Sequence, residues 1–71
     1  MNKIIIKEEF FWRQCNNQGW ESVSDVARVT GLTTTTIYNK LEGGWRLLEL
    51  RGLASLWDIG FDGLMQRGVD K

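Results

Sequence analysis

Apolar residues recur at helical spacing along this chain, in short stretches that glycines separate. Residues three or four apart lie on one face of a helix, so each stretch predicts one short helix. The expected helices cover residues 7–18, 22–30, 33–42, 46–57 and 61–67. The gaps hold Gly19, Gly31, Gly43, Gly44 and Gly60, and glycine disfavours a continuing helix. The pattern therefore predicts a single all-α domain of five short helices that begins and ends with the chain.

The second and third expected helices form the most specific local pattern. Ser22 and Asp25 have the spacing of a capping box, in which the serine caps the helix and an acidic side chain follows three residues later. Gly31 is expected to end this helix, because glycine enters the left-handed conformation at low cost. Thr33 can cap the next helix, and Ala27 is small enough for two helices to cross closely. Residues 22–42 therefore predict a helix-turn-helix.

The fourth expected helix is apolar nearly all round, with leucines at 47, 48, 50, 53 and 56 and a tryptophan at 57. Such a helix is either the central buried element or part of an interface. Gly52 within it costs about 1 kcal/mol relative to alanine, which favours close packing against another backbone. Before the first helix, Ile4–Ile6 are all β-branched and predict either a short strand or a first helical turn.

Length and composition limit how such a domain can be stabilised. At 71 residues and 8.2 kDa its core is small, and domains of this size often depend on disulfides, a metal or a second subunit. One cysteine excludes an internal disulfide, and the absence of histidine removes most zinc patterns. We therefore expect no metal and no cofactor. Stability should come from self-association or from the four tryptophans, at 12, 20, 45 and 57.

Nine basic residues balance nine acidic residues, so the net charge is zero. This excludes a polybasic tail that coats nucleic acid by charge alone, but not a shaped contact made by a few side chains. The apolar run Ile4–Ile6 is too short for a signal peptide or a membrane span. Cys15 is expected in the core, and a lone free thiol fits a reducing compartment, so we expect a cytoplasmic protein. No catalytic constellation is present, and we expect no enzyme.

Two segments carry a resemblance to a known family: residues 22–44, SVSDVARVTGLTTTTIYNKLEGG, and residues 56–65, LWDIGFDGLM. The first looks like the helix-turn-helix of the Cro/cI-type (XRE-like) family of regulators, whose fold is lambda-repressor-like. The second is similar to the segment that joins this family's fourth and fifth helices. The resemblance covers about residues 8–67. Leu41 stands one position later than in most members, with Lys40 in the usual apolar slot, which is similar to relatives that serve as antitoxins. The loop before Ser22 is one residue longer, and Gly60 and Gly63 replace residues that favour the last helix.

The resemblance implies a set of DNA-contacting residues. In this family the second helix of the motif lies in the major groove and its first turn faces the bases. Asparagine can bind adenine through two hydrogen bonds, and a threonine methyl can contact the thymine methyl. The alternative is that four consecutive threonines are only a capped, exposed helix start. The expected DNA contacts, to bases or to phosphates, are Ser22, Arg28, Thr33, Thr34, Thr35, Thr36, Tyr38, Asn39, Lys40 and Arg46.

The function that follows from the resemblance is sequence-specific repression of transcription, as in phage or prophage regulators that control their own promoters. A neutral domain attracts phosphate weakly, so we expect a homodimer on a palindromic double-stranded DNA operator, with recognition helices about 34 Å apart. Competing functions are a protein-binding module, such as an antitoxin with secondary DNA binding or an anti-CRISPR-associated regulator, and a purely helical interaction domain. Ile4–Ile6, pairing as a strand across a two-fold axis, is the alternative dimer contact. The expected dimer surface comprises Leu50, Leu53, Trp57, Phe61, Leu64 and Met65.

Overall fold

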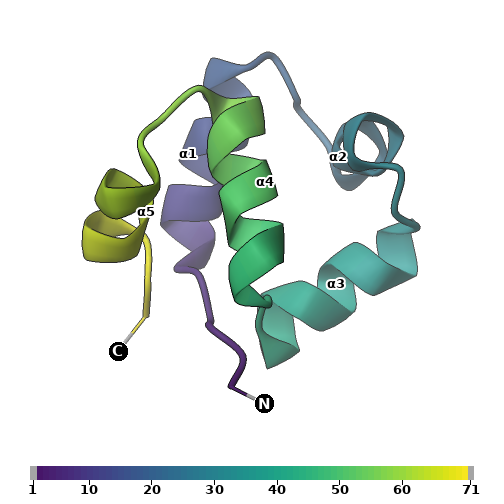
Figure 1. Cartoon of the computed structure of the whole chain (residues 1–71). Coiled ribbons are helices and arrows are strands. Elements are labelled where there is room, and N and C mark those ends of the chain that lie inside the picture. The colour runs from purple at the N-terminus through teal and green to yellow at the C-terminus, as the bar shows by residue number, and fades with distance from the viewer. Residues whose placement is uncertain (1, 71) are drawn as a thin grey trace.

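Five α-helices make up the computed structural model of the chain, which describes residues 2–70 (Figure 1). The all-α prediction with five helices is confirmed, and each helix boundary lies within one residue of the expected one. None of the helices in the described part is long and apolar enough to cross a membrane. In chain order they are α1 (Glu8–Asn17), α2 (Val23–Thr30), α3 (Thr34–Gly43), α4 (Leu47–Trp57) and α5 (Phe61–Arg67).

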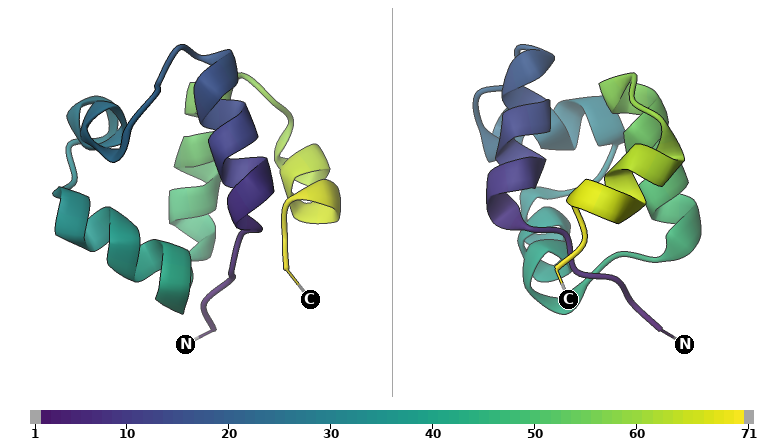
Figure 2. Two further views of the ribbon diagram at one scale, coloured as in Figure 1. Left: turned by 180° about the vertical axis from the view of Figure 1, so that it is seen from behind. Right: turned by 90° about the vertical axis from the view of Figure 1, so that its left-hand side faces the viewer.

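The helices are arranged around a central pair, α1 and α4, which lie alongside each other (Figures 1 and 2). Helix α5 packs against α4 on one side of this pair, and α2 and α3 pack against each other on the opposite side. Figure 1 views α2 nearly end-on while α3 runs across the view, so these two helices meet steeply. As a result α3 lies at one edge of the molecule, with its outer face directed away from the core.

Aromatic rings fill the centre of the core. Phe11 is fully buried and touches three tryptophans, with ring centroids 5.1 Å from Trp12, 5.9 Å from Trp45 and 5.5 Å from Trp57. Aromatic side chains bury large areas and gain further from edge-to-face and offset contacts, so a few of them can stabilise a small core. Trp45, Trp57 and Cys15 are buried as expected, whereas Trp12 and Trp20 are half-buried.

The segment before α1 is neither of the two structures that its sequence predicts. Ile4 forms an isolated bridge with Trp45, with N–H···O distances of 2.8 and 2.7 Å, and Ile6 forms another with Val69. The Ile5 carbonyl also accepts a hydrogen bond from the Asp70 backbone N–H at 2.8 Å. The segment therefore pairs with its own chain on both sides, with Trp45 before α4 and with residues 69 and 70 after α5. This pairing argues against Ile4–Ile6 as a strand shared between two copies.

The predicted dimer surface is wrong for four of its six residues. Leu50, Leu53, Trp57 and Leu64 expose between 0 and 3 % of their surface, because they belong to the hydrophobic core. Phe61 and Met65 are half-buried, and the Arg51 guanidinium lies 4.6 Å from the Phe61 ring centre. The sequence of α4 has no polar stripe to distinguish its inner leucines from its outer ones. The exposed leucines are instead Leu47, Leu48 and Leu56.

Candidate nucleic-acid interface

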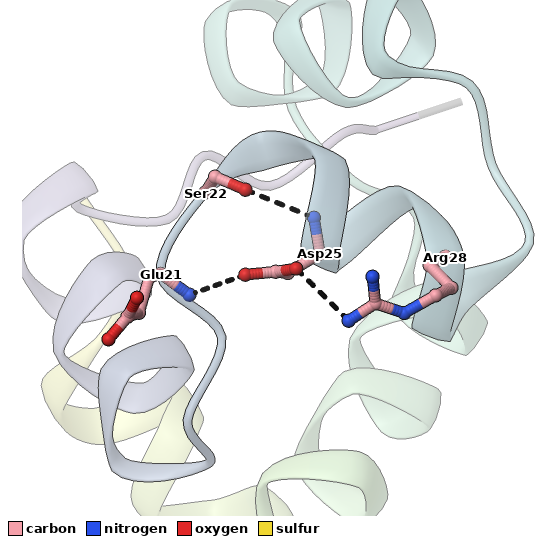
Figure 3. A network of polar contacts seen from close by, with 4 residues as sticks. All are labelled: Glu21, Ser22, Asp25 and Arg28. Carbon is pink, nitrogen blue, oxygen red and sulfur yellow. Dashed lines mark hydrogen bonds and ion pairs between the residues drawn. The ribbon is translucent and has the colours of Figure 1, made fainter.

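Helix α2 begins with the serine cap that its sequence predicts, but the Asp25 carboxylate bonds the Glu21 N–H and not the Ser22 N–H of a capping box (Figure 3). The Ser22 hydroxyl accepts a hydrogen bond from the Asp25 backbone N–H at 3.3 Å. The Asp25 carboxylate accepts one from the Glu21 N–H at 2.9 Å and one from the Arg28 guanidinium at 3.0 Å. The Glu21 N–H, followed by Arg28, holds the pKa of Asp25 below its ordinary value. These contacts fix the start of α2 and hold Arg28 on its exposed side.

The turn from α2 to α3 sets the angle between the two helices. Gly31 adopts a left-handed conformation, with φ of 78°, and its N–H donates to the Ala27 carbonyl at 2.9 Å. A side chain with a Cβ is strained in this conformation, which explains the glycine. Val26 in α2 and Ile37 in α3 are fully buried and attach both helices to the core. The orientation of α3 is therefore determined by packing rather than by a mobile linker.

The start of α3 uses its threonines in two different ways. The Thr33 hydroxyl accepts a hydrogen bond from the Thr36 backbone N–H at 3.1 Å and donates one to the Thr36 hydroxyl at 2.8 Å. Thr33 and Thr36 therefore serve the helix cap. Thr34 and Thr35 are exposed, and within residues 2–70 their hydroxyls form no hydrogen bond. This first turn presents two hydroxyls and two methyl groups to solvent.

The outward face of α3 continues from these threonines along the helix. Asn39 is exposed, and Tyr38 exposes 54 % of its surface. Positions one, two, five and six of a helix share one side, so Thr34, Thr35, Tyr38 and Asn39 form one surface opposite the buried Ile37. We call these four residues the α3 face. Glu42 is also exposed and places an acidic group at the end of this surface, which the sequence pattern does not single out.

Lys40 does not take the place that the sequence predicts for it. Its ammonium lies 2.6 Å from the Glu49 carboxylate of α4 and 5.8 Å from the centre of the Trp45 ring. Burial opposes ionisation of Glu49. Hydrogen bonds from Lys40 and from the Arg46 N–H, the latter at 2.7 Å, more than offset it and lower the pKa of Glu49. Lys40 therefore ties α3 to α4, and its prediction as a phosphate contact is not supported.

The remaining predicted cations lie around α3. Arg28 is exposed on α2, and its surface ion pair with Asp25 is weak enough to exchange for another anion. Arg46 is exposed just beyond the end of α3. Lys3 is not expected from the sequence, because only the fold brings it near this region: a Cβ placed on Gly44 would lie 2.9 Å from the Lys3 Cβ. Three exposed cations therefore border α3.

The rest of the described chain offers little site chemistry. Within residues 2–70 no three His, Cys, Asp or Glu side chains gather as a metal site. Burial raises the pKa of Cys15 to about 11, so the thiol is protonated at neutral pH. The α3 face is thus the most distinctive polar surface of the fold.

Three comparisons found no match for the chain, whether among family models, curated proteins or solved structures.

Proposed function

We propose that this chain is a sequence-specific DNA-binding repressor in which α2 and α3 form a helix-turn-helix of the lambda-repressor-like kind. The observation that carries the proposal is the α3 face. Its threonine and asparagine side chains are exposed and uncommitted, while the neighbouring Thr33 and Thr36 hydroxyls serve the cap. The fold holds α3 at an edge of the molecule through Ile37 and Leu41, where a DNA groove can reach it.

The chemistry of the α3 face suits base edges in the major groove. The Asn39 amide can donate to adenine N7 and accept from its N6 amino group in a paired contact. The methyl groups of Thr34 and Thr35 can contact the thymine methyl, and their hydroxyls can bond with either kind of base. The first backbone N–H groups of α3 carry the positive end of the helix dipole, which favours an adjacent phosphate. Specific readout therefore needs no large positive charge.

The charge distribution predicts a modest electrostatic contribution to binding. Three exposed cations, Lys3, Arg28 and Arg46, border α3, and Lys40 is already paired with Glu49. If each neutralises one phosphate, two copies release about six counterions, and log K falls against log salt with a slope of about −5. A basic repressor with more phosphate contacts has a steeper slope. A slope near −10 would contradict this distribution of contacts.

As a repressor the protein acts by occupying an operator and excluding RNA polymerase, and we propose that the operator lies at its own promoter. One copy reads only a few base pairs through α3, so a palindromic operator with two copies supplies the missing specificity.

Selection from a random duplex library tests the proposal when the operator sequence is not known. The wild-type protein should enrich an inverted repeat with half-sites about 10 to 11 base pairs apart, one helical turn. A gel-shift with the DNA immediately upstream of the gene then asks whether the motif occurs there. Asn17→Ala, an exposed asparagine at the far end of α1, is the matched control for changes in α3. Recovery of no motif after repeated rounds would refute the proposal.

A further inference from the structure

The outer side of α4 carries an apolar surface that the fold leaves uncovered. Leu48, Gly52 and Leu56 follow one another at intervals of four, so they form one row along the helix. Leu48 exposes 79 % of its surface and Leu56 39 %, and Val29 of α2 exposes 37 % beside them. We call these four residues the α4 face. Figure 1 looks onto α4 from the side opposite α1.

The α4 face is shaped as well as apolar. A groove of about 250 Å³ runs between α2 and α4, with Val29, Leu32, Gly52 and Leu56 in its wall. A second hollow of about 460 Å³ is lined by Leu48 together with Asn2, Arg46, Leu47 and Glu49. Glu49 lines both hollows, so they adjoin along α4.

Gly52, like Gly43 and Gly60, has no neighbour within the described chain that requires a glycine, but it alone of the three lies within the α4 face. A Cβ placed on Gly52 would meet nothing within 4 Å, so no neighbour in residues 2–70 requires a glycine. Alanine is the better helix former at this position. A glycine in the middle of an exposed apolar row does allow a second backbone to approach closely. In a two-fold interface a residue on the axis meets itself, so two copies of Gly52 give the closest approach that two helices can have.

The charges around the α4 face fit a second copy of the same chain. In a self-complementary interface every unpaired charge on the axis meets its own like. Here Glu49 is neutralised by Lys40, and Arg51 is placed over the Phe61 ring. We propose that the α4 face binds a second copy of this chain, with Gly52 at the two-fold axis. The residues of the α4 face carry no charge of their own that would bind an anionic membrane or an acidic protein, although Arg46 lines the hollow beside Leu48.

The proposal rests on the proposed function, because a palindromic operator requires two copies. A half-site spacing of about 34 Å puts each α3 about 17 Å from the two-fold axis. The chain measures 26 × 23 × 19 Å, so a separation of this size fits within one copy. The four residues are fewer than a standard interface of about 800 Å² per partner contains. The dimer should therefore be weak in free solution and complete itself on DNA.

Two variants at the α4 face separate association from folding. Gly52→Leu enters open space in one copy and replaces a poor helix former, so its urea midpoint should stay equal or rise. Leu48→Asp puts an acidic residue in the first turn of α4, where the helix dipole favours it. Sedimentation equilibrium from about 1 μM to 1 mM, the range of weak dimers, measures the dimer dissociation constant. Both variants should raise it at least about 10-fold.

Ile5→Asp is the matched control, since Ile5 exposes 40 % of its surface and lies outside the α4 face, in the segment before α1. It should leave the dissociation constant within about twofold, as an exposed residue outside the interface does. The proposal is overturned if Ile5→Asp disrupts the dimer while Gly52→Leu and Leu48→Asp do not. It is also overturned if the wild-type chain remains a monomer at about 1 mM. If the wild-type chain is a monomer that still selects a single half-site, the proposed dimer surface is wrong and DNA reading stands. If it is a dimer that Leu48→Asp disrupts but that selects no duplex, the dimer surface stands and DNA reading is wrong.

Discussion

Replacing Glu49 with glutamine tests how α3 is held against α4. The Glu49 carboxylate accepts hydrogen bonds from the Arg46 N–H at 2.7 Å and from the Lys40 ammonium, which lies 2.6 Å away. The amide oxygen of glutamine can still accept from Arg46, so Glu49→Gln removes the charge but keeps the contact at the start of α4. The substitution isolates the ion pair between the two helices.

The expected loss is set by the partial burial of the pair. The Lys40 and Glu49 side chains expose 19 % and 32 % of their surface. The burial of this ion pair is therefore intermediate between that of a fully exposed pair and that of a buried pair. Exposed pairs contribute up to about 1 kcal/mol, and removing one partner of a buried pair costs about 3 kcal/mol or more. We expect Glu49→Gln to lower the free energy of unfolding by about 1.5 kcal/mol, with a fall in Tm of about 6–12 °C for a domain of this size.

The pH dependence of the loss distinguishes the charge from the shape of the side chain. Because the pKa of Glu49 is lowered in the folded chain, its stabilisation is complete above the unfolded value of about 4.3. It disappears as the pH falls through the folded pKa. The difference in unfolding free energy between wild type and Glu49→Gln should be full at pH 7 and should shrink as the pH falls below about 4.3, the unfolded value. Asp25 also has a lowered pKa, but it is present in both proteins and cancels in the difference.

Urea unfolding followed by the fluorescence of the buried tryptophans Trp45 and Trp57 measures this gap. Lys40→Met should produce a similar loss, and adding it to Glu49→Gln should cost little more, because both remove one interaction. Equal stability of wild type and Glu49→Gln at pH 7 would refute the reasoning. So would a gap that persists unchanged at about pH 3, below the unfolded carboxyl pKa.

Single substitutions elsewhere in the chain have equally definite expected outcomes. Glu42→Lys replaces the acidic group at the end of the α3 surface with a basic one. We expect about 10-fold tighter operator binding at about 0.1 M salt and a steeper salt slope, as measured by fluorescence anisotropy. Weaker binding would contradict the placement of a phosphate there. The rise in the pKa of Cys15 from 9.0 to about 11 reduces the thiolate fraction about 100-fold. Alkylation of the folded chain at about pH 7.5 should therefore be at least about 100-fold slower than alkylation of the chain unfolded in urea. Equal rates would show that the thiol is accessible in the folded chain. Asp58 ends α4 with φ of 58°, a conformation costly for side chains, so Asp58→Gly should raise Tm by about 3 °C in a thermal melt, whereas a fall would reveal an additional role for the carboxylate.

The parts of this fold that depend on neighbouring residues could be predicted from the sequence. Ser22 and Thr33 each accept a hydrogen bond from the backbone N–H three residues later, and Asp25 accepts one from the Glu21 N–H four residues earlier. Gly31 ends α2 through its own backbone conformation. Such signals are local, so a few neighbouring residues are enough to predict each helix boundary. The exposed α3 face could also be predicted, since helical spacing puts its members opposite Ile37.

The parts that depend on distant residues could not be predicted. Lys40 pairs with Glu49 across two helices, and Lys3 reaches α3 only because Ile4 bridges to Trp45. The same limit explains the dimer surface. Leucines surround α4, so only the packing of α1 and α5 reveals which of them remain exposed. The sequence indicated the helix of the proposed interface but not its side.

Whether α3 reads base edges is decided by the affinity of Asn39→Ala for a selected operator. We expect this variant to bind the operator about 5- to 150-fold more weakly at each half-site, the loss of a paired contact to adenine worth about 1–3 kcal/mol. It should bind a scrambled duplex as wild type does, and it should tolerate any base at one position of the half-site. Asn17→Ala should match wild type on both duplexes. Unchanged operator affinity, or an equal loss on the scrambled duplex, would rule out base reading by α3.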